Sequence, residues 1–217
     1  MSTALISIGA RALFANYAAL QTTGNNIANA NTPGYSRQSV ELATATSQFT
    51  GGGFFGKGVD VASVLRAHSE LLTRELHVAT AVSAGDEMRA SQLQRLESVF
   101  ATGEPGLGFA ASQFLNSFVD VASNPQDSSA RQVVLSNADV LARRFSAAGD
   151  RISELQNGVV QELGVAVTTL NTLAQGVADL NQRIGAALGL HQPPNDLLDQ
   201  RDEMIRKISE IVPVTTI

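Results

Sequence analysis

Large apolar residues recur every seven positions at the start of the chain. These residues, here called the heptad seam, are Ile6, Leu13, Leu20 and Ile27. A repeat of this kind indicates an α-helix, which we expect to run from about residue 2 to residue 31. The positions between them are small or polar, so the apolar stripe is too narrow to cover a globular core. We therefore expect the seam to pack against a partner helix, with a poorly ordered terminus as the alternative.

The rest of this predicted helix is rich in Ala, Asn, Thr and Ser and has hardly any charge. A helix face that meets water usually carries charged side chains. The neutral surface therefore favours close packing of this helix against other subunits.

The helix is predicted to stop at a five-residue turn motif. The motif consists of Asn31, Thr32, Pro33, Gly34 and Tyr35. A proline disfavours helical backbone in the residue before it, and it has no N–H to donate. Pro33 and Gly34 suit the two central positions of a type II turn, in which the glycine supplies a positive φ.

Two short runs with alternating apolar and polar residues follow the turn. They cover residues 38–42 and 59–64, and the glycine-rich segment 51–58 separates them. Alternation with a period of two indicates β-strands. We expect the two runs to pair as an arm-like β-hairpin with a long glycine-rich tip.

Helical periodicity dominates the next part of the chain. Apolar residues repeat at helical spacing over residues 68–100, 111–121 and 128–188. In the third segment the spacing alternates between four and three residues, and one extra step of four before Leu163 has the form of a stutter. Five glycines lie in this segment, and each costs about 1 kcal/mol relative to alanine. We therefore expect bends or a break in the long helix, with close contacts at some of the glycines.

The last predicted helix follows two prolines. Asn195 or Asp196 is expected to cap it, and apolar residues continue at helical spacing to Val212, before Pro213. Residues 214–217 are typical of the start of a strand. No terminating feature follows them, so we expect the chain to be a fragment of a longer protein.

These elements together predict a mainly α fold. We expect an elongated helical bundle or coiled coil with a long heptad helix and a small glycine-rich β-hairpin arm after the N-terminal helix. Four parts are predicted, namely an N-terminal coiled-coil helix at 1–33, a turn plus β-hairpin connector at 34–67, a helical bundle domain at 68–213, and the start of a further segment at 214–217.

Charge excludes several classes of function. The 217 residues carry 15 basic and 20 acidic side chains, which gives a net charge of −5, and the arginines are spread along the chain. A nucleic-acid site needs a clustered basic face, so we expect no nucleic-acid partner. The adjacent pair Arg143 and Arg144 is interpreted as a solvated face rather than a phosphate site.

Apolar runs and cysteine content limit the partners and the cellular locations that the protein can have. No stretch approaches the roughly 20 apolar residues that span a bilayer, so we expect no membrane partner. Cysteine is absent, which excludes disulfides and thiolate metal sites. The first ten residues contain no basic residue before Arg11, so they lack the charged start of a secretory signal. If the protein is exported, it uses a route that does not cleave such a peptide.

Candidate catalytic residues are sparse. The three histidines, His68, His77 and His191, form no zinc-binding motif, and neither a GxSxG motif nor a cysteine nucleophile occurs. Carboxylate pairs such as Asp199 and Asp202 are interpreted as helix caps and local ion-pair partners. We therefore expect no catalytic residue, no metal site and no cofactor.

One segment partly matches a phosphate-binding loop. Gly51–Lys57 fits the pattern G-x-x-x-x-G-K, but Gly58 stands where such a loop has Ser or Thr to hold magnesium. The loop also needs a helix after it, so that the helix N-terminus meets the phosphate, whereas a strand-like run follows here. We interpret the segment as the hairpin tip rather than a nucleotide site.

Several motifs resemble a family of bacterial flagellar proteins. Residues 25–35, NNIANANTPGY, look like the N-terminal signature shared by flagellar rod, hook and hook-associated proteins. The continuation Ser36–Gln38 is similar to the hook-associated protein 1 family. Further similar segments, which extend the resemblance over nearly the whole chain, are GGFFGKGV at 52–59, LESVF at 96–100, SNP at 123–125 with Arg131, and NDLLDQRD at 195–202.

The resemblance implies a structural protein rather than an enzyme. In this family the N-terminal helix pairs with a C-terminal helix in a coiled coil that lines the axial tube. The segment from Gly34 through the hairpin joins that core to an outer helical domain. Subunits pass unfolded through the type III export apparatus of the flagellum and assemble as a ring at the distal end of the hook, where they adapt the hook lattice to the filament lattice.

The resemblance also implies partners and a location. The partners are further copies of the protein, the hook protein, a second hook-associated protein and the flagellar export apparatus. The location is the extracellular hook–filament junction. The family's contacts with an export chaperone lie towards a C-terminal end that these residues do not include, so chaperone binding is not carried over to this chain.

Three other interpretations stay open. Another axial protein, such as a rod or hook subunit, shares the motif at Asn31–Tyr35 but is not expected to have the long heptad helix after Ser128. A nucleotide-binding protein or enzyme rests only on Gly51–Lys57. A generic coiled-coil adaptor or secreted effector would leave the turn motif and the hairpin unexplained.

Overall fold

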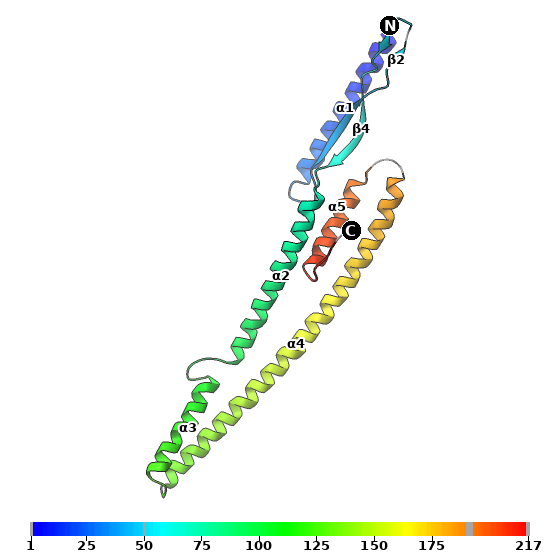
Figure 1. Cartoon of the computed structure of the whole chain (residues 1–217). Coiled ribbons are helices and arrows are strands. Elements are labelled where there is room, and N and C mark those ends of the chain that lie inside the picture. Colours follow the sequence, from blue (N-terminus) through cyan, green and yellow to red (C-terminus); the bar gives the residue numbers. More distant parts are fainter. Residues whose placement is uncertain (1, 50, 190–192, 216–217) are drawn as a thin grey trace. The chain divides into compact units, whose positions relative to one another are not determined.

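The computed structural model describes residues 2–49, 51–189 and 193–215 and has the predicted mainly α fold (Figure 1). The ends of these helices and strands differ from the predicted ends by a few residues at most, and β2 and β3 are additional. Residues 214 and 215, where the start of a strand was expected, do not form a strand. The helices are α1 (Ser2–Ala28), α2 (Glu70–Val99), α3 (Leu107–Ser123), α4 (Ser128–Leu188) and α5 (Asn195–Ser209), and the strands are β1 (Gln38–Thr44), β2 (Gln48–Phe49), β3 (Phe54–Phe55) and β4 (Val59–Arg66).

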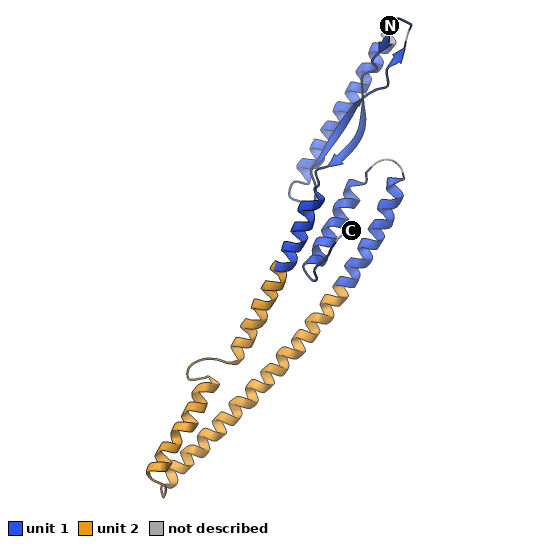
Figure 2. Cartoon of the chain, viewed as in Figure 1, with its two compact units in different colours: residues 1–82, 170–217 blue, residues 83–169 orange. Residues whose placement is uncertain are grey.

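The chain forms two compact units (Figure 2). Unit 1 contains residues 1–82 and 170–217, and unit 2 contains residues 83–169. Unit 1 therefore holds α1, the hairpin, α5, the first part of α2 and the last part of α4. The division of the chain into four parts at 1–33, 34–67, 68–213 and 214–217 stays a prediction.

The predicted β-hairpin is confirmed. β1 and β4 pair antiparallel, with Gln38 opposite Arg66 and Thr44 opposite Val59, and the register shifts between Glu41 and Leu42. β2 and β3 continue the arm with two further residue pairs, in which Phe49 lies opposite Phe54. The glycine-rich segment thus forms the tip, and a strand rather than a helix follows it, as the hairpin interpretation requires.

Helix α1 packs against the hairpin through Ile8 and several small side chains. Ala15 is buried, and Ile8, Ala12 and Thr22 on the same side of the helix are half-buried. A Cβ on Gly58 would lie 3.3 Å from the Ile8 side chain, so the strand backbone approaches the helix closely there. The expectation that the neutral face of this helix serves other subunits is therefore wrong for this side, because the chain's own hairpin covers it.

The helices of unit 1 share a small core. It contains Leu180 and Ile184 of α4, Ile205 and Ser209 of α5, and His77 of α2, all of which are buried. Helices α4 and α5 are neighbours in the sequence, whereas α2 lies about 100 positions earlier, so this core connects distant parts of the chain.

Bends or a break were expected at the glycines of α4, and the break is wrong, because α4 runs unbroken from Ser128 to Leu188. A glycine keeps its backbone N–H and C=O, and therefore weakens the hydrogen-bond ladder of a helix without interrupting it. The expected close contact occurs at Gly176, where a Cβ would lie 2.8 Å from Met204 Sδ. The other four helical glycines of α4 face open space.

Polar contacts join the helices of unit 2. Arg95 of α2 donates to Glu162 of α4 at 2.6 Å, and Gln92 donates to the same carboxylate at 2.9 Å. Arg144 of α4 donates to the backbone carbonyls of Glu104 and Gly106, both at 2.7 Å. The sequence interpretation placed Arg144 on a solvated face. The structure corrects this, because Arg144 donates to carbonyls of the loop before α3.

We predict that two glycine replacements in α4 have different effects on stability. Gly185→Ala adds a methyl group in open space and should raise the free energy of unfolding by about 1 kcal/mol. Gly176→Ala should raise it by less, or lower it, because Met204 must move. Urea unfolding followed by circular dichroism measures both. Equal gains would show that Met204 does not need the space at Gly176.

Candidate functional site

The N-terminal half of α5 binds Ser36, which follows the turn motif, and the base of the hairpin. These hydrogen bonds and ion pairs are here called the polar latch. The backbone N–H of Ser36 donates to Asp199 Oδ2 at 2.9 Å, and Gln38 Nε2 donates to Asp196 Oδ1 at 3.1 Å. Positions 196 and 199 are three apart, which places both carboxylates on one side of the helix. The latch therefore connects residues that are separated by about 160 positions in the sequence.

Strand β4 supplies the cation of the latch. Arg66 Nη1 lies 3.0 Å from Asp199 Oδ1 and 2.8 Å from Asp202 Oδ2. The side chains of Arg66 and Asp199 are only 10% and 8% exposed, so water screens their charges weakly. Removal of one member of such a pair leaves a buried charge without compensation, which is far more costly than loss of an exposed pair.

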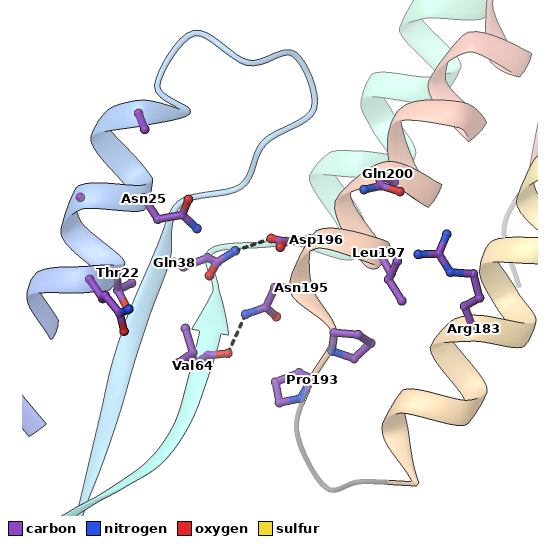
Figure 3. Close-up of a pocket in the computed structure, with 14 residues that line it drawn as sticks. Thr22, Asn25, Gln38, Val64, Arg183, Pro193, Asn195, Asp196, Leu197 and Gln200 are labelled. Atoms are coloured by element: carbon purple, nitrogen blue, oxygen red, sulfur yellow. Dashed lines mark hydrogen bonds between the residues drawn. The ribbon is translucent and has the colours of Figure 1, made fainter. Parts of the chain in front are cut away.

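The sequence interpretation of the α5 carboxylates needs correction. Asp199 and Asp202 were expected to serve as caps and local partners, but they bind Arg66 from a distant strand. Asn195 and Asp196 were expected to cap the helix, but Pro194 holds the cap position and no side chain caps the helix there. Instead, Asn195 Nδ2 donates to the carbonyl of Val64 at 2.7 Å (Figure 3).

The predicted turn at the motif is confirmed. The N–H of Tyr35 donates to the carbonyl of Thr32 at 3.2 Å, and Gly34 has a φ of 78°, as the second central residue of a type II turn requires. Thr32 Oγ1 donates to Asn29 Oδ1 at 3.2 Å, so the motif also contacts the end of α1. Asn31 and Pro33 are exposed.

Asn26 joins the turn to strand β1. Its side-chain amide donates to the carbonyl of Gln38 and accepts from the Gln38 N–H, both at 2.8 Å, in the manner of a strand neighbour. The Tyr35 hydroxyl donates to the same Asn26 oxygen at 2.8 Å. Burial, together with the nearby charges of Asp196 and Asp199, raises the pKa of Tyr35, so this hydroxyl keeps its proton.

Gly34 lies directly against α5. A Cβ at this position would lie 2.8 Å from the Glu203 Cβ. Glu203 cannot move away easily, because Arg206 Nε and Nη2 donate to its two carboxylate oxygens at 2.7 and 2.8 Å. The same hydrogen bonds lower the pKa of Glu203, so the carboxylate stays ionised at neutral pH. The glycine of the motif is thus needed both for its positive φ and for the close approach of a helix.

The four residues of the heptad seam lie exposed on α1. Ile6, Leu13, Leu20 and Ile27 have exposed fractions between 69% and 73%. They lie on the side of the helix that faces away from the hairpin, since Ala15 marks the covered side. Isolated exposed apolar residues are common, but a continuous stripe of them is typical of an interaction surface.

An open cavity of about 1010 Å³ lies beside the latch, between α1 and the start of α5 (Figure 3). Its walls combine polar and apolar residues without charge, and Arg183 and Asp196 are the charged residues of this lining. Within the described ranges, no group of three or more His, Cys, Asp and Glu side chains is placed to hold a metal ion. In that same part of the chain, no helix has the length and apolarity needed to cross a bilayer.

Two family models match the chain. The model described as "Flagellar hook-associated protein FlgK helical domain" matches residues 93–217, and the model described as "Flagella basal body rod protein" matches residues 6–35. The second match contains the whole heptad seam and ends on Tyr35, the last residue of the turn motif.

Curated relatives have the same family name. The chain is 33% identical over 214 residues to flagellar hook-associated protein 1 of Salmonella typhimurium, and 31% identical over 214 residues to that of Escherichia coli. Each match covers 98% of this chain and 39% of the relative. Flagellar hook-associated protein 1 of Bacillus subtilis is 33% identical over 213 residues, which cover 94% of this chain and 42% of the relative. The chain thus spans about two fifths of the length of these relatives.

We predict that Gly34→Ala destabilises unit 1 by on the order of 3 kcal/mol. The alanine must adopt a positive φ, and its Cβ must displace Glu203. Gly51→Ala is the matched control, because Gly51 has a similar φ of 80° but open space around it, so this change should cost only about 1 kcal/mol. Thermal unfolding of both variants tests the prediction. A similar loss in both would mean that the approach of α5 to Gly34 contributes nothing.

Proposed function

Because the chain belongs to the flagellar hook-associated protein FlgK family, we propose that its protein is a structural component of the bacterial flagellum that forms the junction between hook and filament. The observation that carries this proposal is the match of the helical-domain model to residues 93–217, more than half of the chain. The exposed heptad seam supports it, since an assembling subunit needs an apolar surface that its own fold leaves uncovered.

We propose that the heptad seam is the assembly surface. The hairpin occupies one side of α1 and leaves the seam on the other, so a further helix can approach it without displacing the hairpin. A seven-residue repeat suits a coiled-coil partner, as the resemblance to the family implies. The polar latch fixes the base of the hairpin to α5. It thereby orients the heptad seam with respect to the helices of unit 1.

The finer details of the proposal follow from the family. The subunits leave the cell through the flagellar type III export apparatus and form a ring outside the cell. The hook protein and a second hook-associated protein are the neighbours of this ring. The role is that of a structural protein without catalysis.

A rod or hook subunit is the second candidate. The observation that favours it is the match of the rod-protein model to residues 6–35. This match covers only α1 and the turn motif, whereas the helical-domain model covers the end of α2 and all of α3, α4 and α5. The junction assignment therefore accounts for more of the chain.

Immunogold electron microscopy on intact flagella of the source bacterium tests the assignment. An antibody against the helical region of about residues 69–212 should give a single band where hook meets filament. Label along the hook or the rod would favour the second candidate. Label confined to the cytoplasm, with unlabelled flagella, would contradict both.

We predict that Leu13→Glu in the complete protein abolishes attachment of filaments to hooks. Leu13 is 73% exposed in this chain, so the change should alter the stability of the isolated residues 1–217 by less than about 0.5 kcal/mol. A buried charge in a coiled-coil seam, in contrast, should prevent assembly. The matched control is Leu13→Met, which keeps an apolar side chain of similar volume. Swimming and junctions that survive Leu13→Glu would show that the seam is not an assembly surface.

A further inference from the structure

His77 occupies an unusual position for a titratable side chain. It lies on α2 within the small core of unit 1 and is only 3% exposed. The side chain lies beside a cavity of about 620 Å³ that α2, α4, α5 and the end of β4 line together.

Helix α5 faces His77 with charges that are already paired. Asp202 accepts from Arg66 at 2.8 Å and from Arg201 at 3.1 Å, and His68 Nδ1 lies 3.7 Å from the same carboxylate. Arg206 donates to Glu203 and Glu210 and adds positive charge on the same helix. Asp202, the carboxylate of α5 beside the His77 cavity, therefore already has two cationic partners and can compensate a positive charge on His77 only in part.

The other elements around the cavity add little compensation. Helix α4 contributes the neutral residues Val177 and Asn181. Helix α2 itself contributes Glu70 and Arg74, which have opposite charges. The end of β4 and the segment after it contribute the cationic Arg66 and the titratable His68. An imidazolium at position 77 would thus be added to a site whose charges are already balanced.

The pKa of His77 agrees with this geometry. Burial lowers the pKa below the ordinary value of 6.5, Asp202 partly opposes the shift, and Arg206 adds to it. The folded chain thus binds a proton at His77 more weakly than the unfolded chain does. Stability from this group is fully present above pH 6.5 and is lost as the pH falls from 6.5 through the lowered pKa.

We propose that His77 is a proton-sensitive element that controls the polar latch: as a neutral imidazole it allows α5 to dock in unit 1, and on protonation it loosens α5. The latch depends on this docking because its acceptors Asp196 and Asp199 belong to α5. Asp196 binds Gln38, and Asp199 binds Ser36 and Arg66. When α5 loosens, these bonds open together. The turn motif, the hairpin and α1 are then free to reorient. The proposal stands on the chain's own contacts and does not depend on the flagellar assignment.

Hydrogen exchange of the Ser36 amide measures the opening of the polar latch directly. This N–H bonds to Asp199 and exchanges when the latch opens. The chain of residues 1–217 is used with His191→Gln throughout, so that only His68 and His77 titrate as histidines. Protection factors are corrected for the intrinsic effect of pH and compared at pH 7.5 and pH 5.0. Carboxylates ordinarily ionise near pH 4 and stay charged over this range.

The Ser36 protection factor should fall by up to about 30-fold between pH 7.5 and pH 5.0, the limit set by a histidine that cannot bind a proton in the closed state. In His77→Gln, which is neutral at every pH, the protection factor should change by less than about twofold. In His68→Gln it should fall as in the parent chain. Amides of α4 in unit 2 serve as the internal reference.

Two results would overturn the proposal. One is a parent chain whose Ser36 protection does not change between the two pH values. The other is a His77→Gln variant with the same loss as the parent chain, which would assign the effect to another group. The comparison uses the ratio between two pH values, so it stays valid if His77→Gln weakens the latch at both. If this variant lacks the native circular dichroism spectrum, His77→Phe replaces it.

Discussion

The interaction on which unit 1 depends is the contact between the carboxylates of α5 and polar groups more than 130 residues earlier in the chain. Arg66 bridges Asp199 and Asp202, and the N–H of Ser36 donates to the other oxygen of Asp199. These groups are mostly buried, so each needs its partner to avoid an uncompensated charge or donor. The polar latch consequently defines where the arm begins and in which direction it leaves α5. The residues just after the turn motif and the NDLLDQRD segment at 195–202 thus bond directly to each other.

The latch and the hairpin together determine which side of α1 is available to a partner. The hairpin packs on the alanine side, around Ala15, where small side chains let the strands approach closely. The large apolar residues of the heptad seam remain on the opposite side. A helix with one side covered by its own hairpin and the other side apolar is suited to a protein that assembles. The hairpin stays bound to the covered side, while the apolar side can bind a neighbouring subunit. The proposed role at the hook–filament junction requires such a helix, and His77 would make its orientation depend on pH.

Much of the fold followed from local sequence signals, whereas the latch did not. The heptad repeat, the alternating runs and the Pro33–Gly34 turn predicted α1, the hairpin and α4 because each depends on periodicity or on backbone preference. The partners of Asp199 and Asp202 were missed, because an acidic residue near a helix start looks the same whether it serves the helix or a distant arginine. Asn26 lies in the NNIANANTPGY segment at 25–35, but only the structure shows that it bonds to the backbone of Gln38. Arg66, at the end of a strand with alternating apolar and polar residues, was a signal of a distant acidic partner.

The most direct test of the latch is the distance between the hairpin and α5 in solution. The chain has no cysteine, so spin labels on Glu41→Cys and Lys207→Cys report on this pair alone. Both positions are exposed, and neither belongs to the latch. Double electron–electron resonance at pH 7.5 should give one narrow distance distribution, which Asp199→Ala should broaden. A distribution that is equally broad with and without Asp199 would contradict the account, because the arm would then be joined to α5 only through the chain between them.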